Sequence, residues 1–329
     1  MSKIGVLGAG TWGTALAIML AQNDHSVTLW SALESELNIL ERTHTHPNLE
    51  GSVIPESMAF TNDISQVCTD KEVLLFAVAS PYVRQTAKNA SAYIKEGQII
   101  VDAAKGLEND TLFTMSQVIK DAVGKDVTVV ALSGPTHAEE VAIGLPTTVV
   151  AACHNLTAAE TVQNIFMNTC MRVYTNEDIL GVELCGALKN IIALACGASS
   201  GLGFGDNAKA AIITRGIAEM SRLGSAMGCD KTTFSGLAGI GDLIVTATSR
   251  HSRNNRAGYL IGAGDTAEDA VKKVGMVVEG INAIAPALEL AEKYGVDMPI
   301  ITAVHKTIVG ELTANEAVTM LMNREKKSE

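Results

Sequence analysis

The first half of the chain alternates short apolar runs with longer segments of helical character. The runs are continuously apolar, which is typical of parallel strands covered on both faces. Repeated strand–helix units of this kind predict a doubly wound, Rossmann-like α/β domain. The predicted strands are Lys3–Leu7, Ser26–Trp30, Val73–Ala79, Ile99–Ala103, Val127–Leu132, Thr147–Ala152 and Met171–Tyr174.

The strand pattern ends near residue 179, and the sequence beyond it is helical and rich in small residues. We therefore expect the α/β domain over residues 1–178 and an all-α domain over residues 179–329. The first helix of the second domain is predicted over Val182–Gly197. Asp206 and Asn207 are candidates to cap the helix that follows it, because short polar side chains are favoured at that position.

Ile4–Ala21 carries no charge over 18 residues, which is long enough for a membrane span. Four glycines, at positions 5, 8, 10 and 13, suit a strand, a tight turn and a helix better than one spanning helix. No other stretch is a good candidate for a span. The sequence therefore predicts a soluble, cytoplasmic protein without membrane insertion.

The composition narrows the classes of partner. The formal net charge is −11, and no basic block occurs outside the last few residues, which argues against nucleic acid or an anionic membrane as the main partner. The six cysteines form no CxxC pair, so we expect free thiols in a reducing compartment. His44 and His46 lack metal-ligand spacing to Cys or carboxylates, and no metal site is predicted.

A GxGxxG motif, formed by Gly8, Gly10 and Gly13, follows the first predicted strand and precedes an Ala/Leu-rich helix. In this context the glycines permit a tight turn, a close approach to a pyrophosphate and close packing of helix on strand. The helix N-terminus offers free N–H groups to phosphates. We therefore predict a dinucleotide cofactor.

The choice between NAD and NADP is left open by the residues. After the second strand an acid favours NAD and a cation favours NADP, but Ser31, Ala32 and Leu33 are neither. Glu34 comes a few positions late. The missing acid removes the usual repulsion of a 2′-phosphate, and nothing obvious attracts one.

Lys189 lies within the apolar helix Val182–Gly197. Lysine is almost never fully buried without a partner, so Lys189 is either a surface residue or a functional charge. Lys105 and the Gly134–Thr136 turn follow strands, where ligands of doubly wound domains bind. A solvated loop is the alternative for Lys105.

Two further features of the second half are candidates for a site. Asp242 follows Gly239-Ile240-Gly241 and is placed at a turn or helix start, where a simple N-cap is the alternative. The stretch Thr246–Arg256 holds three arginines with neighbouring Ser and Asn residues. Such a cluster suits a phosphate or carboxylate, and a solvated charged loop is its alternative.

The chain resembles bacterial-type NAD(P)-dependent glycerol-3-phosphate dehydrogenases over nearly its whole length. The resemblance is carried by separated motifs in the same order: GAGTWGTALA, AKGLE, SGPTHAEE, GVELCGALKNIIAL, GFGDNAKAAIITRG, GLAGIGDL, SRHSRNNR and VVEG. It implies hydride transfer between dihydroxyacetone phosphate and sn-glycerol 3-phosphate for phospholipid synthesis. It also implies a homodimer and a slight preference for NADP over NAD, although Ala32 stands where the family often has His or Arg.

The resemblance also assigns roles to residues. Lys189 matches the proton acceptor. The implied substrate contacts are Lys105, Gly134, Thr136, Lys189, Asp242, Ser252, Arg253 and Asn254, and the implied cofactor contacts are Gly8, Gly10, Thr11, Trp12, Gly13, Lys105, Ala138, Arg253, Val277 and Glu279. His137 stands where phenylalanine is common and is expected to change packing only.

In the reduction, a protonated Lys189 returns a proton to the developing alkoxide, and in the oxidation its neutral amine removes one. Burial and a nearby Lys105 are expected to lower the pKa of Lys189, with Asp242 and Asn190 orienting it. Ser252, Arg253 and Asn254 are the expected phosphate anchor. Two alternatives are a related dehydrogenase of a hydroxy acid or sugar acid, and a non-catalytic dinucleotide sensor.

Overall fold

The computed structural model describes residues 1–167, 170–326 and 328, and the chain divides into two compact units. The N-terminal unit comprises Met1–Lys105 and Phe113–Val182. The helical unit comprises Gly106–Leu112 and Glu183–Glu329. The predicted domain boundary between residues 178 and 179 stays a prediction.

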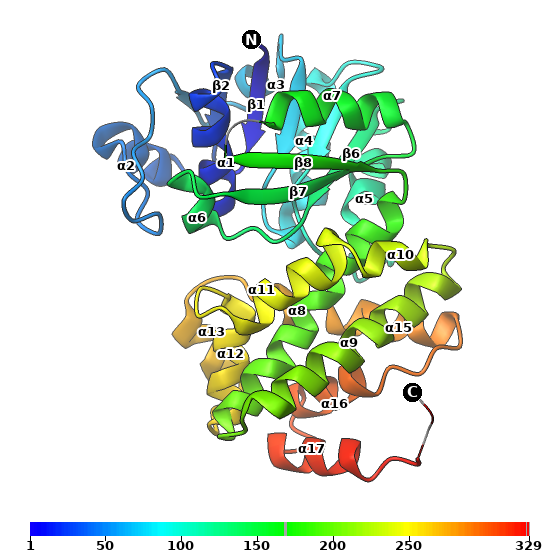
Figure 1. Ribbon diagram of the computed structural model, residues 1–329. Helices are drawn as coiled ribbons and strands as arrows, with labels where there is room; N and C mark the ends of the chain where they lie inside the picture. The colour runs from blue at the N-terminus through cyan, green and yellow to red at the C-terminus, as the bar shows by residue number, and fades with distance from the viewer. Residues whose placement is uncertain (168–169, 327, 329) are drawn as a thin grey trace. The chain divides into compact units, whose positions relative to one another are not determined.

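The N-terminal unit is built on one sheet of eight strands in the order β3-β2-β1-β4-β5-β6-β7-β8 (Figure 1). Neighbouring strands from β3 to β6 are parallel, which confirms the doubly wound prediction for this part. The strands are β1 Lys3–Leu7, β2 Ser26–Trp30, β3 Ala59–Thr61, β4 Val73–Phe76, β5 Ile99–Asp102, β6 Thr128–Ser133, β7 Thr147–Ala152 and β8 Met171–Asn176.

Two features of the sheet differ from the sequence prediction. β7 pairs with β6 in the antiparallel sense, and β8 is parallel to β7, so the last two strands run opposite to the others. The helix between β6 and β7, α6 Ala138–Ala142, has five residues, too few to return the chain across the sheet as a parallel connection requires. β3 was not predicted because it has only three residues.

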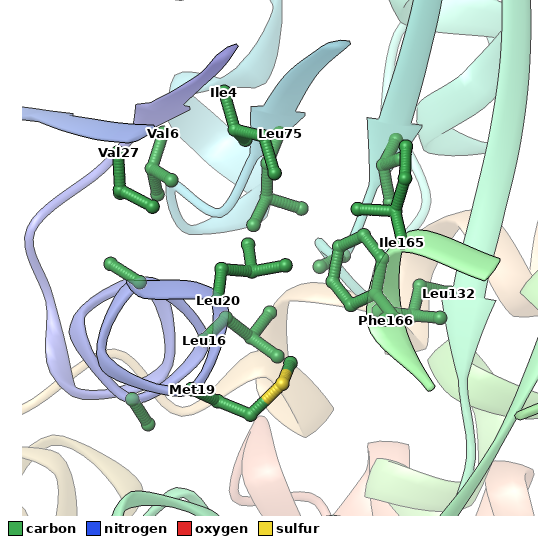
Figure 2. Packing of buried hydrophobic residues seen from close by; sticks show 14 of the residues in the cluster. Ile4, Val6, Leu16, Met19, Leu20, Val27, Leu75, Leu132, Ile165 and Phe166 are labelled. Atoms are coloured by element: carbon green, nitrogen blue, oxygen red, sulfur yellow. The ribbon is translucent and has the colours of Figure 1, made fainter. Parts of the chain in front are cut away.

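Helices cover both faces of the sheet. Helices α1 Thr11–Gln22 and α7 Leu156–Phe166 pack on one face, and α4 Val83–Ala90 and α5 Met115–Val123 pack on the other. Figure 2 shows Leu16 and Leu20 of α1 directed toward strand residues such as Leu75. The remaining helices of this unit are α2 Glu34–Thr43, α3 Ile64–Cys68, α6 and the single turns η1 Ser80–Tyr82 and η2 Ser91–Tyr93.

The stretch Ile4–Ala21 forms β1, the glycine turn and α1, as predicted, and is not one helix. In the described part of the chain, the helix that is long and apolar enough to cross a bilayer is instead α8, Ile179–Gly201, which the sequence prediction of spans did not single out. Within its most apolar window, 89% is buried inside the protein. This helix is therefore the core of the unit that contains Glu183–Glu329, and its composition reflects burial by protein.

The helical unit follows the prediction of an all-α domain. Its second helix, α9 Asp206–Ala226, begins earlier than expected, so that Gly205 is the N-cap and Asp206 lies in the first turn. After α8 and α9 come α10 Lys231–Phe234, the π-helical turn η3 Leu237–Gly241, α11 Asp242–Thr248, α12 Arg253–Gly262, α13 Ala267–Val274, α14 Glu279–Asn282, α15 Ile284–Lys293, α16 Pro299–Ile308 and α17 Ala314–Met322.

Glycines bring the backbones of α8 and α12 into direct contact. A Cβ atom added at Gly197 of α8 would lie 2.1 Å from the carbonyl oxygen of Asn255, and one added at Gly258 of α12 would lie 2.1 Å from that of Leu194. Gly201 and Gly262 extend the same reciprocal pattern by one helical turn. These contacts hold α12, from Asn255 to its end at Gly262, against the last two turns of α8.

Candidate active site

The glycine turn of the N-terminal unit has the geometry of a dinucleotide-binding turn. Gly8 has a φ of +120°, and a Cβ atom there would lie 2.8 Å from the backbone nitrogen of Val78. A Cβ atom on Gly13 would lie 1.9 Å from the carbonyl oxygen of Gly8. Gly10 is exposed, with nothing within 4 Å of an added Cβ atom. Gly8 and Gly13 are therefore required by packing, whereas Gly10 leaves open space beside the turn.

The residues at this turn fit a dinucleotide. No side chain caps the N-terminus of α1, which begins at Thr11 directly after Gly10. Its first-turn N–H groups are thus placed to bind phosphate oxygens. In addition, the indole nitrogen of Trp12 is buried without a hydrogen-bond acceptor in the described part of the chain. A buried donor without an acceptor is rare and indicates a missing partner.

Lys105, Gly134 and Thr136 converge in the N-terminal unit. Nζ of Lys105 and Oγ1 of Thr136 both donate to the carbonyl oxygen of Gly134, at 3.2 and 3.1 Å respectively. Gly134 has a φ of +149°, and a Cβ atom there would lie 3.0 Å from the carbonyl oxygen of Thr148. The ends of β5 and β6 therefore present one ammonium and one hydroxyl beside the same tight turn.

Lys189 lies at the centre of a hydrogen-bonded cluster in the helical unit. Its Nζ donates to Oδ1 of Asp242 and, at 2.8 Å, to Oγ1 of Thr246. The Thr246 hydroxyl in turn donates to the carbonyl oxygen of Asp242, one helical turn earlier, at 2.7 Å. α11 thus presents Asp242 and Thr246 to Lys189 on one face. Asp242 is at the helix start, as predicted, and its contact with Lys189 goes beyond a simple N-cap role.

The electrostatics of this cluster are those of a buried ion pair. The side chain of Lys189 is 6% exposed and that of Asp242 is 0% exposed. Burial favours the neutral amine, and the adjacent carboxylate favours the ammonium. The hydrogen bonds to Asp242 and Thr246 therefore hold the Lys189 amine at a fixed position in a buried environment.

The Ser252–Asn254 cluster, expected to be a phosphate anchor, is partly engaged in holding the helices together. Oγ of Ser252 accepts from the backbone nitrogen of Asn255 at 3.2 Å and caps α12. Asn254 is buried, donates to Oδ1 of Asn190 at 2.9 Å and accepts from the nitrogen of Gly280 at 2.8 Å. Arg253, the first residue of α12, is half-buried. Of these three predicted contacts, Arg253 is the one with a charge to offer an anion.

Asn190, expected to orient Lys189, has a different set of partners. Its Nδ2 donates to the carbonyl oxygen of Gly186 at 3.1 Å, and its Oδ1 accepts from Asn254. Because Asn254 also binds Gly280, this amide pair joins α8, α12 and α14. Glu279, at the start of α14, is thereby placed next to a residue of the same network.

Other predicted positions lie at the ends of elements. Ala138 is the first residue of α6 and packs against the core of the N-terminal unit. His137 is the N-cap of that helix. Val277 lies in the loop before α14. Thr246 was predicted only as the start of the cationic stretch and not as a partner of Lys189, although its spacing of four residues from Asp242 on a helix was a usable signal.

A doubly wound unit with this glycine turn and a helical unit with a buried Lys–Asp pair define a dinucleotide-dependent dehydrogenase of the two-domain class. Residues 3–159 match the family model for the NAD-dependent glycerol-3-phosphate dehydrogenase N-terminus, and residues 178–319 match the model for its C-terminus. The chain belongs to the NAD-dependent glycerol-3-phosphate dehydrogenase family.

Individual relatives agree over the full length. The chain is 61% identical to an NAD(P)+ glycerol-3-phosphate dehydrogenase of Lactobacillus delbrueckii subsp. bulgaricus, with 100% of this chain and 99% of the relative covered. It is 52% identical to the enzyme of that name from Agathobacter rectalis, with 100% and 98% covered. The crystal structure of glycerol-3-phosphate dehydrogenase from Coxiella burnetii is similar with a TM-score of 0.94 and 35% identity, covering 98% of this chain and 99% of that one.

Proposed function

We propose that this protein interconverts dihydroxyacetone phosphate and sn-glycerol 3-phosphate with NAD(P)H and thereby supplies glycerol 3-phosphate for phospholipid synthesis. The full-length relatives carry this activity in their names. The observation that carries the proposal in the structure is the buried Lys189–Asp242 pair. It supplies one transferable proton, which is what reduction of a ketone by hydride requires besides the hydride itself.

The dinucleotide supplies the hydride when bound, and this chain's residues are assigned to hold it and to manage the proton. The backbone around Gly8, Gly10 and Gly13, with Thr11 and Trp12, holds the cofactor in the N-terminal unit. Lys105, Ala138, Arg253, Val277 and Glu279 are the further assigned cofactor contacts.

Lys189 is assigned as the proton donor in reduction and the proton acceptor in oxidation. Asp242 and Thr246 fix its Nζ, since both are hydrogen-bonded to it. In reduction, Lys189 gives up its proton and becomes a neutral amine beside the Asp242 carboxylate. In oxidation, this neutral amine accepts the proton of the alcohol. A fixed donor of this kind contributes through orientation as well as acid–base chemistry.

The substrate phosphate is assigned to Arg253, because a guanidinium fork gives paired charge-assisted bonds to a phosphate. Ser252 and Asn254 position this residue, the first by capping α12 and the second by tying it to α8. Lys105, Gly134 and Thr136 are the assigned substrate contacts of the N-terminal unit, and Lys189 and Asp242 those of the helical unit. The homodimer and the cytoplasmic location stay predictions.

The test adds dihydroxyacetone phosphate to the protein with NADH or NADPH and measures the oxidation of the cofactor as a loss of the absorbance of the reduced nicotinamide. We expect turnover in the wild type and a fall in kcat of about 100-fold or more in Lys189→Ala, the size of general acid–base effects. Lys272→Ala is the matched control, since that lysine is exposed and paired with Glu268 on α13. Wild-type turnover in Lys189→Ala would overturn the role of Lys189.

A further inference from the structure

The end of β2 carries a carboxylate that the linear sequence does not reveal. The three residues after the strand, Ser31, Ala32 and Leu33, are uncharged. In the structure Oγ of Ser31 donates to Oε2 of Glu36 at 2.5 Å. The same oxygen of Ser31 accepts from the backbone nitrogen of Leu33 at 3.1 Å. Ser31 is 5% exposed, so a buried hydroxyl holds the Glu36 carboxylate at the strand end.

This position lies beside the glycine turn. Leu7 of β1 is the register partner of Trp30 of β2. One residue further on, the nitrogen of Gly8 donates to the carbonyl oxygen of Trp30 at 3.0 Å. Ser31 therefore directly follows the residue that is hydrogen-bonded to the first glycine of the motif. In doubly wound domains the group at this place meets the adenosine ribose of the dinucleotide.

The charged residues in the first turn of α2 are both acidic. Glu34 and Glu36 both lie in the first turn of α2, whose basic residue, Arg42, is in the last turn. A glutamate three residues beyond the N-cap commonly reaches back to the N-cap backbone. Glu36 is instead bonded to the side chain of Ser31, five residues earlier. Its carboxylate is thereby held near the end of β2.

We propose that Glu36, held by Ser31, determines cofactor choice and makes this chain prefer NAD(H) to NADP(H). A carboxylate at this position accepts a hydrogen bond from the ribose 2′-hydroxyl of NAD. It repels a 2′-phosphate, which carries up to about two negative charges near neutral pH. The inference rests on the proposed function and runs opposite to the slight NADP preference that the resemblance implied.

The test measures binding separately from catalysis. The dissociation constants of ADP-ribose and of its 2′-phosphorylated form are determined by calorimetry, because these probes carry the adenosine ribose but no nicotinamide. We expect wild type to bind ADP-ribose at least about tenfold more tightly, corresponding to roughly 1.4 kcal/mol. In Glu36→Gln the affinity for the phosphorylated probe should rise and the ratio should fall several-fold. Glu34→Gln, with the same charge change in the same helical turn, should leave the ratio near wild type.

Two further measurements make the outcome decisive. Ser31→Ala releases the Glu36 carboxylate and should reduce the discrimination, although it leaves the net charge unchanged. In the reduction of dihydroxyacetone phosphate, the ratio of kcat/KM for NADH to that for NADPH should change in the same direction as the binding ratio. Equal or tighter binding of the phosphorylated probe by wild type, or an unchanged ratio in Glu36→Gln, would overturn the proposal. Discriminating binding without turnover would instead contradict the proposed function alone.

Discussion

The contact between α8 and α12 provides a sharp test of how the helical unit builds its site. Gly258 lies inside α12, and a Cβ atom there would lie 2.1 Å from the carbonyl oxygen of Leu194. Ordinary van der Waals contact begins near 3.4 Å, so the substitution Gly258→Ala forces the two helices apart by more than 1 Å. A backbone carbonyl inside a helix cannot rotate out of the way.

Two opposing terms set the size of the effect. Replacing glycine with alanine inside a helix normally stabilises by about 1 kcal/mol. Overpacking against a rigid backbone costs about 3 kcal/mol at the upper end of its usual range. We therefore expect a net destabilisation of about 2 kcal/mol, or a fall in Tm of roughly 4–8 °C for a domain of this size.

The same displacement should reach the site. The bond from Asn254 to Asn190, 2.9 Å long, joins the first turn of α12 to α8 one residue beyond Lys189. A shift of more than 1 Å would break it and move Arg253 with the helix. Misplacement on this scale can lower kcat/KM by up to about 100-fold. We expect most of this loss as a raised KM for the phosphorylated substrate, because Arg253 is the assigned anchor.

Thermal unfolding and steady-state kinetics on the purified variant measure both effects. Gly205→Ala is the control, since nothing lies within 4 Å of an added Cβ atom there and its φ is −87°. It should cost less than about 1 kcal/mol, the usual size of an N-cap change, and leave kcat/KM unaltered. If Gly258→Ala instead raised Tm, as at an uncrowded helical glycine, the close helix contact would be refuted.

Two further predictions concern buried polar groups of the helical unit. Burial raises the pKa of Glu219 to about 7 although it accepts from the nitrogens of Ile300 and Ile301. The contribution of Glu219 to stability is therefore fully present below pH 4.5 and is lost as pH rises to about 7. The free energy of unfolding should fall by about 3 kcal/mol over this range, and Glu219→Gln should abolish this pH dependence. Parallel urea-unfolding profiles of the two proteins over this range would contradict it. The hydroxyl of Ser199 is buried without a partner in the described chain, and Ser199 lines an apolar cavity with Leu194 and Ile261. Ser199→Ala should therefore raise the free energy of unfolding by about 1 kcal/mol. Ser200→Ala loses a 3.0 Å hydrogen bond to the carbonyl oxygen of Cys196. It should therefore show no rise in stability in the same thermal unfolding experiment.

The strand framework could be predicted because buried parallel strands leave continuous apolar runs. All seven predicted strands exist, with ends that differ by up to three residues, as for β4, which ends at Phe76. The reversed direction of β7 and β8 could not be predicted, because an apolar run has the same appearance in either direction. It depends on the length of the connection through α6, which carries no strong helix signal.

Within the site, residues that are unusual among their sequence neighbours could be predicted. Residues whose role depends on contacts between distant elements could not. Lys189 was identifiable because a charge interrupts an apolar helix, and Gly8 because the glycine pattern follows a strand. The partnership of Asn254 with Asn190 depends on two helices meeting 64 residues apart in sequence. Likewise the contact between Glu36 and Ser31 depends on how α2 begins after β2. Neither contact leaves a periodic trace in the sequence.

The buried pair Lys189–Asp242 is difficult to explain by stability. Removing two charges from water costs several kcal/mol, and such pairs are often replaced by apolar residues with no loss. The double variant Lys189→Met with Asp242→Leu should therefore have a free energy of unfolding within about 1 kcal/mol of wild type, or above it. It should have no measurable turnover. Lys189→Met alone leaves the Asp242 carboxylate buried at 0% exposure without its cation, and should lose about 3–5 kcal/mol. A double variant as unstable as the single one would show that α8 needs the pair to fold. The expected result would instead show that the charge is retained in this helix for the chemistry it performs.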